Sequence, residues 1–230
     1  DIIYKKLQNI VYTKLKNILN INPTTNIDFR KNLISNVQTL EFHNITELET
    51  QDWGITIKAD GERNLLFIDN NLSTYLINSR NEIIDISKSV KNLDQQYKNT
   101  IIDCEIINST ENLILAFDLL VCKGENYMSK SLIDRLTCLK SIISDKETPI
   151  TIDNFKFKLK KFCFKDNENL LSECIETIWN TKYKYEIDGI IFTPNNSSNG
   201  YKSLSYKWKP VDMLTIDFLI KKVSEDNFNM

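Results

Sequence analysis

Hydrophobic residues near the start of the chain recur at the three- to four-residue spacing of a helix. They predict a helix over residues 2–20 that ends before Pro23 and has one apolar side, made of Ile3, Leu7, Ile10, Val11, Leu15 and Ile18. A second helix is expected from Ser129, its N-cap, to about Ser144. A third is expected near residues 167–181. We expect the first helix to pack on the sheet of its own chain rather than on a partner.

From residue 53 onward the pattern changes to the alternation that is typical of strands. Apolar runs over residues 53–58, 63–69, 72–78 and 81–86 are separated by the turn sequences Asp-Gly, Asp-Asn-Asn and Ser-Arg-Asn. We interpret these runs as an antiparallel meander. Further strands are expected over residues 100–107, 112–122, 185–193, 204–209 and 213–222. The run 112–122 is nearly all apolar, which indicates a central strand.

The number and order of these elements predict the fold class. Strands outnumber helices and rarely alternate with them one for one, which favours α+β with mainly antiparallel sheets and flanking helices. The chain has 230 residues, of which 41% are hydrophobic, enough to bury one sizeable core. We expect a helical N-terminal segment over residues 1–52, packed on one domain that spans residues 53–230.

Composition argues against several kinds of function. The net charge is −2 and the pI about 5.6, so a bound RNA would need a local basic patch rather than a general positive field. Five scattered cysteines without CxxC spacing indicate reduced thiols in a cytosolic protein and argue against zinc. No apolar run reaches the roughly 18 residues that span a bilayer. We therefore expect a cytoplasmic protein without membrane contact.

Two further features of the sequence are its single histidine and its first residue. His43 is the one histidine, and because no partner residue stands near it in the sequence we interpret it as structural. Ser-His-Asp and Cys-His catalysis would both have to rest on that residue. The chain begins with Asp1 rather than methionine, so we expect it to be a piece of a longer polypeptide.

The run KADGER, from Lys58 to Arg63, lies between two apolar strand-like runs. A lysine at the end of a strand, followed at once by an Asp-Gly turn and an arginine, suits attack of the amine on an α-phosphorus while cations hold the phosphates. The run resembles the nucleotidyl-lysine motif, Lys-x-Asp-Gly-x-Arg, that mRNA capping guanylyltransferases share with polynucleotide ligases. The resemblance implies that Lys58 is the nucleophile and that Arg63 contacts the ribose.

The run YKWKP supplies candidate phosphate ligands. Lys207 and Lys209 are two residues apart on a strand and therefore share a face, with Trp208 on the other face. Alternating lysines can equally protect an edge strand from aggregation. The run nevertheless resembles the Lys-x-Lys phosphate motif of the same superfamily, and KWKP followed by TIDF at 215–218 is the form typical of capping enzymes.

A metal carboxylate is expected in EIDGIIFTP, residues 186–194. Asp188 would face the site beside the close backbone approach that Gly189 allows. Glu186 competes for this role because strand parity puts it on the same face. Ligases usually carry Glu-Gly here, whereas Asp-Gly followed by an aliphatic run and Phe-Thr-Pro resembles capping enzymes. The resemblance implies that Asp188 holds Mg²⁺ or Mn²⁺.

Ribose and base contacts are implied by two further runs. Glu105 is charged within an apolar strand and resembles the glutamate that binds ribose hydroxyls in this superfamily; Asp103 is a weaker candidate on the same face. Phe117 in LAFDLL resembles the aromatic residue that covers one face of the purine, and Ile190 would cover the other. Phe117 as an ordinary core residue is the alternative. Asp118 would be structural or help to hold a metal.

Three basic residues have less specific patterns. Arg80 follows a strand at a place where the family often has an arginine near the triphosphate, although an arginine in a polar turn is usually solvated. Lys160 and Lys161 lie in a segment similar to a capping-enzyme Lys-x-Phe strand. They would reach a phosphate or the guanine edge, or form a plain charged face.

The order and spacing of these runs are more specific than any single one. KADGER, DCE, FDLL, EIDGII and KWKP occur in the family's order, and the resemblance covers about residues 53–218. The chain is therefore identified as resembling the nucleotidyltransferase domain of mRNA capping enzymes, most of all the multifunctional enzymes of large cytoplasmic DNA viruses. The resemblance implies a domain of the ligase and capping type, which is ATP-grasp-like, and we expect the OB-fold domain that follows it in the family to be absent from this chain.

The resemblance implies a function and its partners. The expected reaction is transfer of GMP from GTP, through Lys58, to a diphosphate RNA 5′ end, with Mg²⁺ or Mn²⁺. The OB-fold, RNA triphosphatase and methyltransferase domains are expected elsewhere in the parent polypeptide. The alternatives are an ATP-dependent polynucleotide ligase that uses the same lysine, and a non-catalytic scaffold of the same fold.

Overall fold

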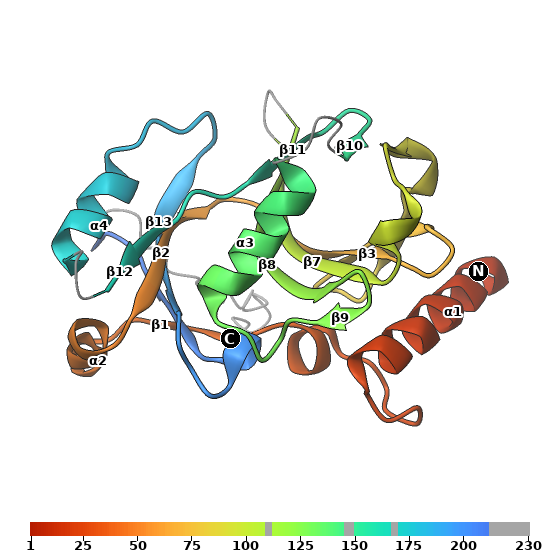
Figure 1. Cartoon of the computed structure of the whole chain (residues 1–230), viewed down its shortest axis with the longest axis horizontal. Helices are drawn as coiled ribbons and strands as arrows, with labels where there is room; N and C mark the ends of the chain where they lie inside the picture. Colours follow the sequence, from red (N-terminus) through yellow and green to blue (C-terminus); the bar gives the residue numbers. More distant parts are fainter. Residues whose placement is uncertain (109–111, 145–149, 167–169, 212–230) are drawn as a thin grey trace, which may run out of the picture.

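Two mainly antiparallel sheets contain most of the strands (Figure 1). The computed structural model describes residues 1–108, 112–144, 150–166 and 170–211. The first sheet has the order β1 (Val37–Thr39), β14 (Ser205–Trp208), β13 (Ile187–Pro194), β2 (Trp53–Ala59) and β12 (Cys163–Lys165). The second has the order β11 (Lys156–Leu159), β8 (Leu113–Cys122), β7 (Thr100–Ile107), β3 (Glu62–Ile68), β4 (Thr74–Asn78) and β5 (Ile83–Asp85), with β9 (Glu125–Asn126) beside β8. The prediction of an α+β fold is confirmed.

Shorter elements complete the structure. A separate strand pair joins β6 (Val90–Lys91) to β10 (Thr151–Ile152). The α-helices are α1 (Ile2–Leu19), α2 (Ile45–Thr50), α3 (Leu132–Ile143) and α4 (Leu171–Trp179). Single turns of π- or 3₁₀-helix cover Phe29–Leu33, Phe42–Asn44, Ser87–Ser89, Gln95–Tyr97 and Gly200–Lys202. The strand predicted over 213–222 and the TIDF run lie outside the described residues.

The chain passes between the two sheets at two short crossings. After β2 in the first sheet, residues 60–61 lead directly into β3 of the second sheet. Between β11 and β12 the chain crosses back through residues 160–162. The first crossing is tight, because a Cβ on Gly61 would lie 2.7 Å from Glu105 Cγ on β7. The two sheets are therefore held together where the KADGER run lies.

The first crossing corrects one prediction. The run over residues 53–58 is not the first strand of a meander, since β2 pairs with β13 and β12, while β3 pairs with β4 and β7. Alternating residues predict that a strand exists but not which strand becomes its neighbour. Only β3, β4 and β5 form the expected meander.

Helices cover both faces of the second sheet. Leu66 and Ile68 of β3 pack in the cluster that includes α3, whereas Leu65 and Phe67 pack in the cluster that includes α1. In Figure 1, α3 crosses one face of this sheet and α1 lies at the right. Burial on both faces explains why β8 is nearly all apolar.

The first sheet has one apolar face and one mixed face. Trp53, Ile55 and Ile57 of β2 belong to a core cluster that also contains residues of α2 and α4. The intervening residues Thr56 and Lys58 line a cavity instead. Strand alternation thus separates the residues that stabilise this sheet from those that face the cavity.

Helix boundaries follow their caps. The predicted N-terminal helix is confirmed to within one residue, and it ends at Asn20 in the left-handed conformation (φ 58°). The cap of α3 is Ser131, whose side chain accepts a hydrogen bond from the Asp134 backbone N–H, so Ser129 was the wrong cap. Helix α4 is shorter than predicted, and residues 167–169 are not described.

The N-terminal segment is part of the fold in two ways. Val11 and Leu15 of α1 are fully buried against the second sheet, as expected for a helix that packs on its own chain. The segment also supplies β1, which pairs in parallel with β14. Among the described residues, no helix has the length and apolar character needed to cross a membrane.

Replacing Leu15 by alanine should lower the free energy of unfolding by about 2–5 kcal/mol, because a fully buried leucine side chain is lost from the interface between α1 and the sheet. Urea denaturation measures the loss. Ile10→Ala is the matched control, since Ile10 is 44% exposed on the same helix and should cost less than about 1 kcal/mol. Equal losses for both variants would show that α1 is not packed as described.

Candidate active site

A cavity of about 240 Å³ lies between the two sheets, at the crossings. It collects residues from β2, β13 and β14 on one side and from β3, β7 and β8 on the other. The residues that line it are Ser35, Val37, Thr56, Lys58, Arg63, Glu105, Phe117, Asp118, Lys160, Phe162, Ile191, Thr193, Ser205 and Lys207. Five of the predicted site residues are therefore brought together although the chain separates them by up to 149 positions, from 58 to 207.

Lys58 is held by an ion triad. Its Nζ lies 2.8 Å from Asp188 Oδ1, and Lys209 Nζ lies 2.6 Å from Asp188 Oδ2. The pairing of β2 with β13 sets Lys58 opposite Gly189, next to Asp188. Partial burial raises the pKa of Asp188, but the bonds from Lys209 and Lys58 outweigh it and hold this pKa below its usual value. Asp188 is therefore an anion between two lysines.

Gly189 makes this arrangement possible. Its φ is +155°, and a Cβ at this position would lie 2.1 Å from the Trp208 carbonyl oxygen on β14. The register of β13 against β2 shifts between Ile187 and Gly189, so Asp-Gly here is a strand irregularity rather than a turn. The competing residue Glu186 is exposed, and its backbone carbonyl accepts a hydrogen bond from the Asp60 N–H.

Arg63 is fixed by a buried partner. Its guanidinium bonds both carboxylate oxygens of Asp103, with Nε 3.0 Å from Oδ1 and Nη2 2.5 Å from Oδ2, and Asp103 is fully buried. Burial lowers the pKa of Arg63, but the charge of Asp103 more than reverses this and raises it. Asp103 is thus committed to Arg63, whereas Glu105 lines the cavity wall.

Glu105 and Phe117 form the neighbouring part of the wall. Lys160 is 5% exposed and its Nζ lies 3.0 Å from Glu105 Oε2. The same Nζ lies 5.1 Å from the centre of the Phe117 ring, and Arg63 Cζ lies 5.4 Å from it. Phe117 lines the cavity and is half-buried, whereas the other residues of β8 are buried.

The structure contradicts the prediction that Ile190 covers one face of the base. This residue is 1% exposed and packs in the core cluster of the first sheet, on the face opposite to the cavity. Its neighbour Ile191 lines the cavity and pairs with Thr56 and Lys207, which line it too. The register shift before Gly189 changes which residues of the DGII run face inward.

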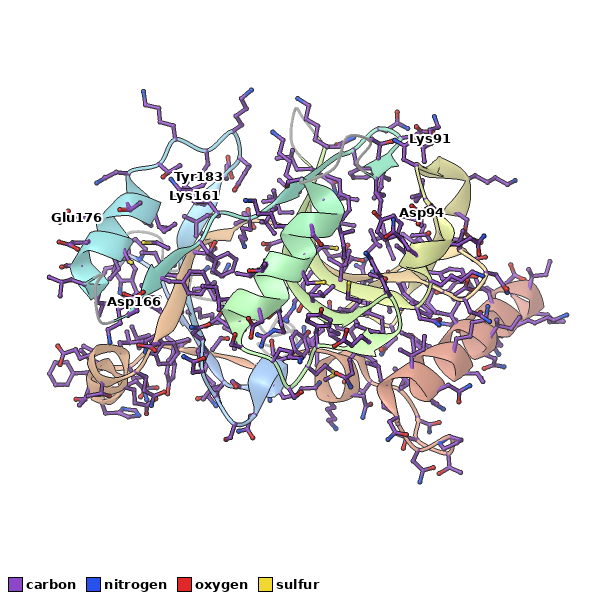
Figure 2. All side chains as sticks on the ribbon, viewed as in Figure 1. Lys91, Asp94, Lys161, Asp166, Glu176 and Tyr183 are labelled. Atoms are coloured by element: carbon purple, nitrogen blue, oxygen red, sulfur yellow. The ribbon has the colours of Figure 1, made fainter. Side chains whose placement is uncertain are left out.

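Arg80 and Lys161 lie outside the wall. Arg80 is in the exposed turn after β4, where it pairs with Glu62 (3.3 Å) and Glu82 (3.0 Å), and it is not among the described residues that line the cavity. Its role near a triphosphate stays a prediction. Lys161 is exposed and bonds the Thr181 hydroxyl at 2.9 Å; Figure 2 labels it in the left part of the molecule. Its side chain belongs to the outer surface.

A buried polar network behind the cavity was not predicted. Arg135 of α3 bonds both oxygens of Asp118, at 2.7 and 3.1 Å, and is 1% exposed. The Tyr201 hydroxyl donates to Asp103 Oδ2 at 2.7 Å. Burial raises the pKa of Tyr201, so the hydroxyl keeps its proton. Asp118 therefore has a structural partner, the first of the two roles considered for it.

The hydroxyl groups of the wall were also missed. Thr56, Thr193 and Ser205 each lie two residues from another residue of the same strand that lines the cavity. These residues are Lys58, Ile191 and Lys207, respectively. Counting by two from Lys58 gives Thr56, and counting by two from Lys207 gives Ser205. Strand parity could thus have found both, whereas Tyr201 carries no sequence signal that links it to Asp103.

The residues at Lys58 fit a metal ion that the substrate helps to hold. Across the described part of the chain, no cluster of three or more His, Cys, Asp or Glu side chains is placed to bind a metal alone. Mg²⁺ usually needs only one or two carboxylates because substrate phosphates and water complete its shell. Asp188 is such a carboxylate, since it is anionic and adjoins the nucleophile candidate.

Comparison with known proteins agrees with this geometry. Residues 7–211 match the family described as mRNA capping enzyme, catalytic domain. The chain belongs to this family. The predicted resemblance to capping guanylyltransferases is thereby confirmed.

Relatives support the same family. The chain is 26% identical over 282 residues to a probable mRNA-capping enzyme of Acanthamoeba polyphaga mimivirus, covering 95% of this chain and 23% of that protein. It is 26% identical over 200 residues to an mRNA-capping enzyme of Caenorhabditis elegans, covering 77% of this chain and 31% of that one. The chain thus spans between about a quarter and a third of the length of these two relatives.

A solved structure shows the shared fold. The ligase domain of LigD from M. tuberculosis superposes with a TM-score of 0.51 at 13% identity, covering 79% of this chain and 61% of that domain. The likeness concerns the fold alone, and it matches the predicted ligase and capping type of nucleotidyltransferase domain.

Tyr201→Phe should lower the free energy of unfolding by about 1–3 kcal/mol, because it removes a hydrogen bond to the fully buried carboxylate of Asp103. Urea denaturation measures this loss. Tyr183→Phe is the matched control: its hydroxyl bonds the Ile178 carbonyl at the end of α4, at 2.9 Å and only partly buried. A loss for Tyr201→Phe no greater than for the control would contradict the proposed support of Arg63.

Proposed function

We propose that this chain is the nucleotidyltransferase domain of an mRNA capping enzyme, which forms a covalent lysyl-GMP from GTP and transfers the GMP to a diphosphate RNA 5′ end. One observation carries the proposal. The Lys58 amine lies against Asp188, at a cavity that presents Arg63, Glu105 and Phe117, in a chain of the capping family.

The cavity suggests how GTP lies. Phe117 and Ile191 come from opposite sheets and would cover the two faces of the base. Glu105 and Arg63 lie opposite each other on β7 and β3, where they would bond the ribose hydroxyls. The phosphates would then extend toward Lys58.

Two lysines lie where the phosphates of GTP would bind. Lys207 of β14 lines the cavity, and Lys209, directly after the end of this strand, lies at Asp188. Phosphate oxygens would compete with Asp188 for Lys209 and so loosen the ion triad. This exchange frees Oδ2 of Asp188 only when a nucleotide is present.

The first chemical step follows from these positions. Lys58 Nζ loses a proton and attacks the α-phosphorus of GTP, and the bond to the bridging oxygen of the β-phosphate breaks as pyrophosphate leaves. Asp188 Oδ1, 2.8 Å from Nζ, orients the amine, and the proton leaves to water, because the lowered pKa of Asp188 makes it a poor proton acceptor. Lys207 and Lys209 offset the charge that develops on the phosphates.

A divalent metal completes this site. Asp188 is the residue that would hold Mg²⁺ or Mn²⁺, and the ion would supply positive charge at the phosphate oxygens. In the second step, a terminal phosphate oxygen of the RNA attacks the same phosphorus, and the bond to Lys58 Nζ breaks. The base and ribose contacts hold the guanylate between the two steps.

Two alternatives use the same fold. An ATP-dependent ligase would also use Lys58, but Asp188–Gly189 and KWKP are typical of capping enzymes, and the capping family matches residues 7–211. A non-catalytic scaffold would have no need for Lys58, Arg63 and Glu105 at one cavity. Since the two relatives are longer proteins, we propose that OB-fold, triphosphatase and methyltransferase domains accompany this chain, and that it acts in the cytoplasm.

Lys58→Ala should abolish the covalent GMP adduct. Among the described residues, Lys209 is the other lysine paired with Asp188, and it does not belong to the KADGER run. The measurement is mass spectrometry after incubation with GTP and Mg²⁺, preferably in the full-length protein. Lys91→Ala is the control: Lys91 pairs with Asp153 at 2.7 Å, and Figure 2 shows it far to the right of Lys161. An undiminished adduct in Lys58→Ala, or labelling by ATP alone in the parent protein, would refute the proposal.

Asp188→Asn should raise the Mg²⁺ concentration needed for half-maximal adduct formation by about tenfold or more, because a neutral amide replaces the carboxylate that lies 2.8 Å from Lys58 Nζ. Titration of labelled GMP adduct against Mg²⁺ measures this. Glu186→Gln, two residues earlier and exposed, is the matched control and should leave the titration unchanged. The opposite result would make Glu186 the metal carboxylate.

A further inference from the structure

Two cysteines that the proposed reaction does not use are in direct contact. Cys122 at the end of β8 and Cys138 in α3 have their Sγ atoms 2.8 Å apart, and both are free thiols. They line an open cavity of about 630 Å³ with Lys123, Glu125 and Tyr127, among others. This cavity shares no lining residue with the one at Lys58. Small solutes can therefore reach the pair without entering the candidate active site.

The surroundings make the two thiols chemically different. The hydrogen bond with Cys122 lowers the pKa of Cys138 to about 7, against the effect of burial. The Tyr127 hydroxyl and the charge of Lys123 lower it further, whereas the charge of Glu125 raises it. The same bond, together with burial, raises the pKa of Cys122. At neutral pH, Cys138 is thus partly thiolate, while Cys122 keeps its proton.

The remaining cysteines lack this combination. Cys104 is fully buried, and burial raises its pKa. Burial and a bond with Cys163 raise the pKa of Cys174, and neither residue lines one of the described cavities. Cys163 lies in β12 and Cys174 in α4, so these two free cysteines also belong to a strand and a helix. They are an internal control for Cys122 and Cys138.

We infer that Cys122 and Cys138 form a peroxide-reactive dithiol site that closes into a disulfide between β8 and α3. The Cys138 thiolate attacks one oxygen of hydrogen peroxide, the O–O bond breaks, and a sulfenic acid and hydroxide form. Cys122 sulfur then attacks the Cys138 sulfur and expels its hydroxyl group, which leaves with the proton of Cys122 as water. In total, two thiols and one peroxide give one disulfide and two waters.

The cross-link has a structural consequence. It joins residues 122 and 138, so it closes the segment that carries β9 and the start of α3. Arg135, one helical turn before Cys138, bonds Asp118 behind the nucleotide cavity. The disulfide therefore fastens the helix that holds this part of the wall, and the oxidised protein should unfold at a temperature higher by several degrees.

The test is intact-mass and peptide analysis of the purified protein after brief treatment with low hydrogen peroxide at pH 7. We expect a mass loss of about 2 Da, a linked peptide pair containing Cys122 and Cys138, and reversal by dithiothreitol. In Cys122→Ser the oxidation should stop at a sulfenic acid on Cys138, which dimedone traps. Cys174→Ser should behave as the unmodified chain.

Three results would overturn the inference. They are free alkylation of both thiols after peroxide, a linked pair of Cys163 and Cys174 formed in place of the one expected, or dimedone labelling of Cys122→Ser no greater than that of Cys138→Ser. Because both serine variants are near-isosteric, circular dichroism that matches the parent chain establishes that the comparison is between folded proteins.

Discussion

The site depends on the tight crossing at Asp60–Gly61. Lys58 and Arg63 are five positions apart, yet one ends a strand of the first sheet and the other begins a strand of the second. A Cβ at Gly61 would meet Glu105 Cγ at 2.7 Å, so the close approach of β7 to this crossing requires glycine. Because the second crossing, at residues 160–162, returns at the same cavity, both sheets present polar side chains to one small volume.

The charges that face this volume are held by burial and pairing. Arg63 is bonded to a fully buried Asp103, which also accepts from Tyr201, and Asp118 is bonded to Arg135. A buried pair gains little net stability over an apolar one, but loss of one partner leaves an uncompensated charge. The network therefore fixes the direction of Arg63 more than it stabilises the fold. Hydrophobic burial stabilises the fold through the clusters on both faces of the second sheet and the cluster on the first.

Sequence patterns predicted the elements well and their arrangement less well. Helical spacing located α1, alternation located β3 and β7, and short runs located Lys58, Glu105 and Lys207 at one cavity. Alternation could not reveal that β2 and β3 belong to different sheets, because partner choice depends on contacts distant in sequence. Nor could it place Ile190, since the register shift before Gly189 is a backbone irregularity without a residue pattern of its own.

In the proposed reaction, the ion triad restrains Lys58 before a nucleotide binds. With Asp188 between Lys58 and Lys209, two ammonium groups share one carboxylate, and Lys58 Nζ is occupied as a donor. A nucleotide brings phosphate anions that outnumber this single carboxylate, and the favourable position for Lys209 then shifts toward them. Release of Lys209 leaves Asp188 with spare acceptor capacity for a cation at the phosphates. In the proposed reaction, the same contact that restrains the nucleophile thus becomes, on substrate binding, part of the charge arrangement that favours attack.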